Sequence, residues 1–161
     1  MARQLSPWFA GLALLPFTAF AVDLPDRPIG FDRLRSEFGE ASVTVEGARE
    51  CVLLDTVLAD SDARRRRGLM WVKSMPPNSG MIFDYVRPRG VSMWMRNTLI
   101  SLDIAFIDAS GIIINIAENT EPLSLNSIAA EEPARYALEL NAGRAAGLGL
   151  QRGSRTWIFT L

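Results

Sequence analysis

The chain contains no histidine and only one cysteine, and both shortages restrict its chemistry. The absence of histidine excludes the Ser-His-Asp and Cys-His catalytic arrangements, histidine-ligated zinc and any histidine proton shuttle. A single cysteine cannot form an intrachain disulfide, so the hydrophobic core has to stabilise the fold. Cys51 lies in the apolar run 51–54, where we expect a small buried hydrophobe. We predict no cofactor.

A large excess of either charge is also missing, since 17 basic residues face 18 acidic ones. Phosphate backbones bind clustered cationic charge, so we do not expect nucleic acid as a partner. The run of four arginines at 64–67 is the exception to this balance. On a helix, four consecutive side chains spread around most of the circumference, which predicts a solvated helix rather than a basic stripe.

The first residues have the features of a secretory signal. A positive charge at Arg3 precedes the apolar stretch 7–20, and Ala19-Phe20-Ala21 matches the small-x-small cleavage pattern. A membrane anchor needs roughly 20 apolar residues, and this stretch is shorter and is interrupted by Pro16. We therefore predict that residues 1–21 are a cleaved signal peptide. The protein is then exported, periplasmic or secreted, and meets the membrane only through this segment.

The rest of the chain is predicted to be one β-rich domain after a tether. Residues 22–41 are polar and mixed, which favours a tether with room for a short helix over 32–38. Short helices are expected over 60–67, with Gly68 as the stop, and over 142–146. Short apolar runs separated by turn residues predict strands over 42–46, 50–56, 80–84, 91–95, 102–108, 112–118, 135–141 and 155–160. The expected class for 42–161 is mainly β, a compact antiparallel barrel or two-layer sandwich with one or two short helices.

Several ordered motifs between residues 50 and 153 carry a family resemblance. They are Arg65-x-x-Gly68-Leu69-Met70, Gly80-Met81-x-Phe83, Trp94-Met95-x-Asn97-Thr98, Leu102-Asp103-x-x-Phe106-x-Asp108, Gly111, Pro122, Leu138-Glu139-Leu140-Asn141-x-Gly143 and Gly147-Leu148. In their order and spacing, this region resembles the domain of unknown function 192 family of bacterial and archaeal proteins. The resemblance implies a compact β-rich fold and frequent export. It implies no reaction, because the family has no established activity.

The densest polar signal is Trp94, Asn97 and Thr98 followed by Asp103. An amide, a hydroxyl and a carboxylate beside an aromatic ring suit a polar ligand such as a sugar or a peptide. Arg65 falls in a family motif and is expected to pair with a buried carboxylate, Asp103 or Glu139. The alternative is structural: Asn97 and Thr98 support a turn, Asp103 accepts backbone or Arg65 hydrogen bonds, and Trp94 belongs to the core.

Three functions remain open from the sequence. The leading interpretation is a non-enzymatic binding or accessory protein of the cell envelope, in which Asn97→Ala or Asp103→Ala abolishes ligand binding and leaves thermal stability nearly intact. A second is a hydrolase of envelope glycans that uses Asp103 and Glu139 as its two carboxylates. A third is a Cu(I)-binding protein, because Met93 and Met95 would share one face of a strand and thioethers are soft ligands.

Overall fold

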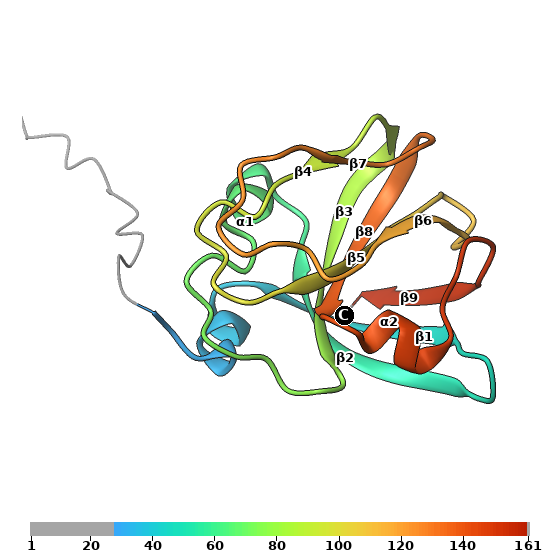
Figure 1. Cartoon of the computed structure of the whole chain (residues 1–161), viewed down its shortest axis with the longest axis horizontal. Helices are drawn as coiled ribbons and strands as arrows, with labels where there is room; N and C mark the ends of the chain where they lie inside the picture. The colour runs from blue at the N-terminus through green and yellow to red at the C-terminus, as the bar shows by residue number, and fades with distance from the viewer. Residues whose placement is uncertain (1–27, 161) are drawn as a thin grey trace, which may run out of the picture.

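Alternating apolar residues build a seven-stranded sheet. The computed structural model describes residues 28–160, so the predicted signal 1–21 and the start of the tether lie outside the described residues. The sheet has the order β6-β5-β8-β3-β2-β1-β9 and a second sheet pairs β4 with β7 (Figure 1). The strands are β1 (Gly39–Glu46), β2 (Cys51–Ala59), β3 (Ser79–Arg89), β4 (Ser92–Met93), β5 (Leu102–Ile107), β6 (Ile113–Ala117), β7 (Ile128–Ala129), β8 (Ala134–Asn141) and β9 (Thr156–Thr160).

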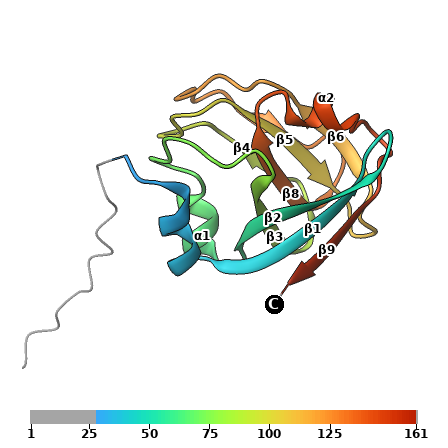
Figure 2. The same ribbon diagram turned by 90° about the horizontal axis from the view of Figure 1, so that it is seen from below.

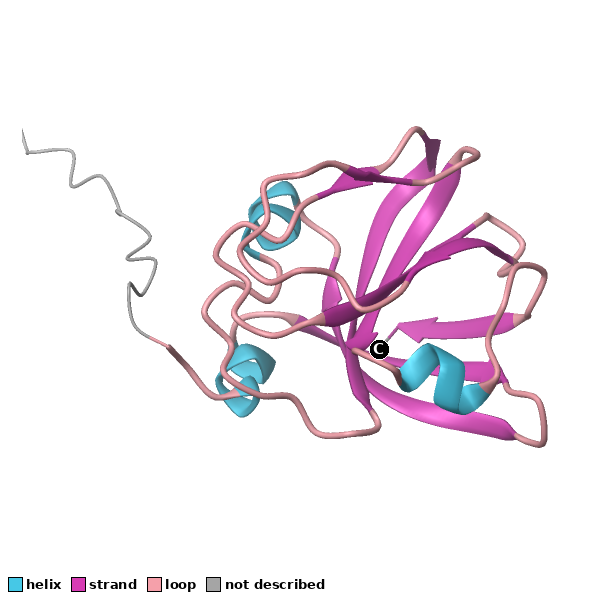
Figure 3. Ribbon diagram, in the orientation of Figure 1, coloured by secondary structure: helices cyan, strands magenta, loops and turns pink. Residues whose placement is uncertain are grey.

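Three short helices accompany the sheets: η1 (Phe31–Ser36), α1 (Asp62–Arg67) and α2 (Arg144–Leu148). Figures 1 and 2 show η1 and α1 near each other and α2 on the other side of the molecule. Figure 3 shows that long loops lie beside η1 and α1. Within residues 28–160, no helix is long and apolar enough to cross a lipid bilayer.

The mainly β class with short helices is confirmed, and the architecture is a sandwich-like curled sheet rather than a closed barrel. The edge strands β6 and β9 approach each other at one end, where Ile112 and Arg155 form a bridge and the Thr156 N–H donates to the Gly111 carbonyl at 2.7 Å. The sheet is mixed, because β2 and β3 pair in parallel while the other pairs are antiparallel. The segment between β2 and β3 contains α1, a short crossover that the predicted all-antiparallel order does not include.

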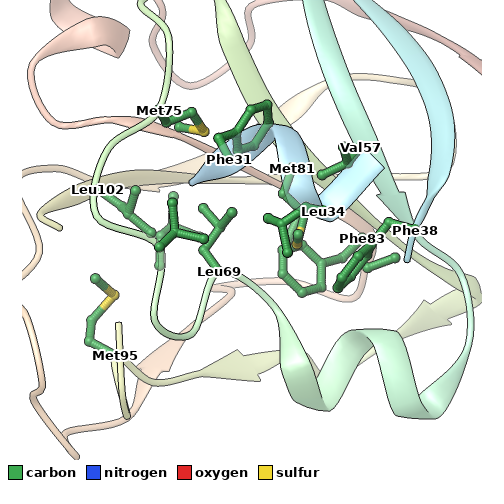
Figure 4. Close-up of a cluster of buried hydrophobic side chains, with 14 of the residues drawn as sticks. Phe31, Leu34, Phe38, Val57, Leu69, Met75, Met81, Phe83, Met95 and Leu102 are labelled. Atoms are coloured by element: carbon green, nitrogen blue, oxygen red, sulfur yellow. The ribbon is translucent and has the colours of Figure 1, made fainter. Parts of the chain in front are cut away.

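Two hydrophobic clusters pack against the sheet. The η1 cluster includes Phe31, Leu34, Leu69, Met81 and Phe83, which Figure 4 shows converging beneath η1. The α2 cluster is built from a separate set of buried side chains, among them Val43, Leu54, Ile82, Leu138 and Leu148. Every residue of β5 is buried, and its alternate residues belong to the two clusters. Strand β5 therefore separates the two halves of the core.

Residues 28–41 differ from the predicted tether because they are part of the folded body. The Ile29 N–H donates to the Trp71 carbonyl at 2.7 Å, which anchors the start of the segment. Phe31, Leu34 and Phe38 are buried in the η1 cluster. These apolar residues recur at helical spacing, so the segment contributes one helical face to the core although its overall composition is polar.

The local predictions are largely confirmed, with shifted ends. Helix α1 begins after Ser61, whose Oγ accepts the Arg64 N–H, and ends at Gly68 as expected. Helix α2 lies two residues later than predicted, because it begins after Gly143 and ends at Gly149, both in the left-handed region. The strand predicted over 91–95 shortens to β4, and β7 was not predicted. Cys51 is exposed rather than buried, because β2 begins with its odd-numbered residues facing solvent.

Candidate functional site

A buried carboxyl group forms the floor of a small pocket. Glu139 of β8 lies between Met81 of β3 and Ile104 of β5, on the side of the η1 cluster. It is only 5% exposed, and its Oε2 atom has no hydrogen-bond partner among the described residues. Burial raises the pKa of Glu139 to about 8, so the carboxyl group is largely protonated at neutral pH. In that form it can both donate and accept a hydrogen bond.

The cavity above this group, here the Glu139 pocket, has a volume of about 80 Å³ and is lined by Arg65, Gly68, Phe83, Tyr85, Trp94 and Thr98, among others. One wall comes from α1 and the residues that follow it. Gly68 ends the helix with a φ of 46°, a conformation that side chains rarely adopt, and Phe83 lies against it. The opposite wall comes from β4 and the loop after it. Helix and loop thus enclose the pocket from two sides.

Two aromatic side chains border the pocket in different ways. Tyr85 is largely buried, and its pKa is raised to about 12 by burial and by the charge of Glu139. Trp94 is 49% exposed, and the Arg96 guanidinium stacks on its ring at 5.5 Å from the ring centre. Trp94 therefore forms the outer rim and is not a core residue, in contrast to the structural interpretation of the sequence.

Each of the four consecutive arginines has a different environment. Arg64 Nη1 pairs with Asp60 at 2.9 Å. Arg65 Nη1 donates to the carbonyls of Asp60 and Asp84, at 2.8 and 2.6 Å, and its Nη2 pairs with Asp62. Arg65 is thus in the pocket wall, but its partners are not the predicted Asp103 or Glu139. Local carbonyls and an acid on the same helix satisfy its guanidinium instead.

Arg67 is the most buried of the four, at 7% exposed. Its Nη1 donates to the Met70 carbonyl, whereas Nε and Nη2 are buried without a partner among the described residues. Burial lowers the pKa of Arg67, which nevertheless stays charged at neutral pH. Arg66, between the half-buried Arg65 and the buried Arg67, is exposed. The sequence predicted a helix whose arginine side chains are all solvated, and this holds for only part of the run 64–67.

A larger open space adjoins the pocket. This arginine groove has a volume of about 1100 Å³ and is lined by Glu37, Asp62, residues 64–67, Arg89, Arg96 and Asn97, among others. Arg65, Arg66, Arg67, Tyr85, Trp94 and Arg96 line both spaces. Pocket and groove therefore form one continuous site.

Most of the predicted site residues meet here. Arg65, Trp94, Thr98 and Glu139 line the pocket, and Asn97 lines the groove beside it. Asn97 has a φ of 58°, typical of asparagine in a turn, and its carbonyl accepts the Trp71 N–H at 2.8 Å. Thr98 is buried at the pocket wall. The turn proposed in the structural interpretation and the ligand-lining position are therefore both present in this segment.

Asp103 does not belong to the site. It is 1% exposed, and its two oxygens accept the backbone N–H groups of Asn119 and Ala145 at 2.9 and 2.8 Å. Asp103 is opposite Leu140 and Glu139 is opposite Ile104, so the two carboxylates point to opposite faces of the sheet. They cannot flank one glycosidic bond, and this removes the geometric basis of the two-carboxylate hydrolase.

The two methionines of the copper hypothesis have different environments, although Met93 packs against the η1 cluster to which Met95 belongs. Strand β4 ends at Met93, which lines the pocket, so Met95 does not continue a shared strand face. Met95 is fully buried in the η1 cluster, where the Thr120 hydroxyl lies 3.3 Å from its sulfur. Among residues 28–160, no group of three or more histidine, cysteine, aspartate or glutamate side chains is placed to hold a metal ion.

The sequence interpretation missed Arg66, Arg67, Tyr85 and Arg96 as lining residues. Tyr85 was missed because β3 continues past the predicted end at residue 84. The arginine run gave no usable signal, because four consecutive identical side chains have no periodicity that distinguishes the buried Arg67 from the exposed Arg66.

Comparisons with known proteins agree with the motif-based resemblance. The model of the family described as "Uncharacterized ACR", domain of unknown function 192, matches residues 42–158. A crystal structure from Sinorhizobium meliloti 1021, provisionally described as a transcription regulator, is 39% identical, with a TM-score of 0.72 over 74% of this chain and 94% of that one. A protein of unknown function from Novosphingobium aromaticivorans is 35% identical, with a TM-score of 0.70 over 72% and 83%. No curated protein matches the chain.

Proposed function

The chain belongs to the domain of unknown function 192 family, and from the geometry of its own site we propose that it is an exported, non-enzymatic protein that binds a small polar ligand in the Glu139 pocket. The observation that carries this proposal is the unpartnered carboxyl group of Glu139 at the pocket floor. Leaving a buried polar group without a partner costs about 1–3 kcal/mol of folding free energy. A ligand group that hydrogen-bonds to Glu139 would recover that cost on binding.

The other lining groups support binding rather than catalysis. Thr98 contributes a hydroxyl, and Trp94 and Tyr85 contribute aromatic surfaces of the kind on which sugar rings and peptide groups pack. Tyr85, whose pKa is raised to about 12 by burial and by the charge of Glu139, is protonated at neutral pH. Asp103, the second carboxylate considered for acid–base catalysis, lies on the other face of the sheet. These features support a receptor for a neutral polar group.

The location in the cell envelope is part of this proposal. It rests on the charge at Arg3, the apolar stretch 7–20 and the pattern Ala19-Phe20-Ala21. N-terminal sequencing of the protein recovered from a periplasmic extract is expected to begin at Val22. An intact N-terminus in the cytoplasmic fraction would contradict the envelope assignment and leave the pocket proposal standing.

The binding experiment uses the purified protein with N-acetylglucosamine and the dipeptide Ala-Ala as probes. We expect saturable changes in tryptophan fluorescence and in the NMR resonances of pocket residues with at least one probe. Glu139→Leu should abolish them, because leucine is close in size and cannot hydrogen-bond. Glu139→Gln should keep measurable binding, because an amide both donates and accepts as the protonated carboxyl does.

The matched control is Glu46→Leu, at an exposed position of β1 outside the site. It should bind like the wild type. Circular dichroism confirms that each variant is folded before binding is compared. If neither probe binds, the pocket is not a receptor of this kind. The same conclusion follows if the Glu139→Leu variant is folded and binds a probe as the wild type does.

A further inference from the structure

The charge around the arginine groove is strongly one-sided. The groove is lined by six arginines and two carboxylates: residues 64–67, Arg89 and Arg96 against Glu37 and Asp62. Both carboxylates already have partners, since Glu37 pairs with Arg33 at 3.4 Å and Asp62 pairs with Arg65. Arg64 is likewise paired with Asp60. The acidic groups of the groove are therefore not available to neutralise its remaining arginines.

Four arginines of the groove are left without an acidic partner among residues 28–160: Arg66, Arg67, Arg89 and Arg96. The whole chain has a net charge of −1, so this concentration of positive charge is local. A concave surface of one sign raises the local concentration of ions of the opposite sign. The charge arrangement thus selects a negatively charged ligand.

Arg67 gives a second and independent indication. It is more than nine-tenths buried, it lines both the pocket and the groove, and two of its nitrogens have no partner in the described part of the chain. Buried guanidinium groups are normally paired or fully hydrogen-bonded, because removing the charge from water is costly. An anionic oxygen group is the natural partner, since it accepts several guanidinium hydrogen bonds at once.

We propose that the ligand of the Glu139 pocket carries an anionic oxygen group, a phosphate or a carboxylate, that binds Arg67 with help from Arg66 and Arg96 at the groove mouth. This inference rests on the proposed function. The neutral polar part of the ligand reaches Glu139, and the anionic part lies toward the arginines. Trp94 lines both the pocket and the groove, so its ring packs against the part of the ligand that joins the neutral and the anionic groups.

The ligand is expected to be a small molecule rather than a nucleic acid. Three of the four unpartnered arginines, Arg66, Arg67 and Arg96, also line the pocket of about 80 Å³, which accepts one small chemical group and no duplex. Outside the groove, exposed acidic residues such as Glu118 and Glu121, which form no ion pair among the described residues, oppose an extended polyanion. The local geometry therefore favours a phosphorylated or carboxylated sugar or peptide.

The test compares glucose, glucose 6-phosphate and glucuronate by isothermal titration calorimetry. We expect at least one of the two anionic sugars to bind about tenfold or more tightly than glucose, which corresponds to one charge-assisted hydrogen-bonded pair. A preference for glucose 6-phosphate identifies a phosphate group, and a preference for glucuronate identifies a carboxylate. Either preference should weaken as the salt concentration rises.

The variant Arg66→Gln with Arg96→Gln should lower the affinity for the anionic sugar by about tenfold more than it lowers the affinity for glucose, because only the anionic group pairs with the two guanidinium charges. These two arginines are exposed, so the variant is expected to fold even where a change of buried Arg67 would not. Arg49→Gln, an exposed arginine in the turn between β1 and β2, is the matched control and should have no effect. Glu139→Leu should weaken the binding of all three sugars.

The outcomes separate the two proposals. Equal affinity for glucose and the anionic sugars overturns this inference, and so does an unchanged affinity in the arginine double variant. In both cases the proposed function stands if Glu139→Leu still abolishes sugar binding. Binding of none of the three sugars overturns this inference, and the proposed function is overturned with it only when N-acetylglucosamine and Ala-Ala do not bind either. Tighter binding of a 20-base-pair DNA duplex than of either anionic sugar, abolished by the same double variant, assigns the groove to nucleic acid and also overturns the inference.

Discussion

Two buried carboxylates on neighbouring strands have opposite environments. Asp103 of β5 faces the α2 cluster, and both of its oxygens accept backbone N–H groups. Glu139 of β8, beside it in the same antiparallel pair, faces the η1 cluster and has an oxygen without a partner. The satisfied carboxylate joins the loop after β6 and the start of α2 to the sheet. The unsatisfied one is a cost to folding that a ligand at the pocket would offset.

The first way to test this contrast is Asp103→Ala, for which we expect the largest effect. The change leaves the N–H groups of Asn119 and Ala145 unpartnered in a buried position. Losing two such bonds to a carboxylate should lower the free energy of unfolding by about 3–6 kcal/mol. Urea denaturation followed by circular dichroism measures the loss. The sequence-based expectation, that this variant stays stable and loses only binding, is thereby reversed.

Asp103→Asn is the matched variant, because the amide keeps one acceptor oxygen and nearly the same shape. It should lose less stability than Asp103→Ala, while the folded fraction keeps its affinity for the pocket ligand. A stable Asp103→Ala protein with no ligand binding would contradict the structural assignment of this residue.

The second test uses pH to reveal the unsatisfied carboxyl group. Folding raises the pKa of Glu139 from 4.5 to about 8, so the folded state holds the proton more tightly than the unfolded state. The contribution of Glu139 to the free energy of unfolding is therefore most favourable below pH 4.5. It is lost as the pH rises through about 8. Between pH 5 and pH 8.5 we expect a loss of about 2–4 kcal/mol from this residue.

Because the chain has no histidine, no imidazole titrates in this interval and the effect of Glu139 can be isolated. Urea denaturation at pH 5, 7 and 8.5 should show the decline in the wild type and a much flatter profile in Glu139→Gln. Glu118→Gln, at an exposed position, should keep the wild-type slope. If the free energy of unfolding changes with pH in the same way in the wild type and in Glu139→Gln, the Glu139 carboxyl group has a partner in the folded protein.

The comparison also shows which parts of the structure were predictable. Turn residues and alternating apolar runs located most strands, and the Gly68 stop fixed the end of α1. The faces of Asp103 and Glu139 could not be assigned, because every residue of β5 is buried and the strand shows no polar alternation. Only the register between β5 and β8 decides which carboxylate meets the pocket. Composition likewise hid residues 28–41, where three apolar side chains at helical spacing outweigh many polar ones.

The smallest expected effect on stability comes from Trp94→Ala, at the rim above Glu139. Trp94 is about half exposed and its described aromatic contact is the stacked Arg96, so its removal should change the free energy of unfolding by less than about 1 kcal/mol. The same variant should measurably lower the affinity for the pocket ligand, because the Trp94 ring lines both the pocket and the groove. Urea denaturation and calorimetric titration on one sample separate the two quantities. A stability loss above about 2 kcal/mol would place Trp94 in the core. Trp94 would then belong, like Asp103, to the part of the molecule that serves folding.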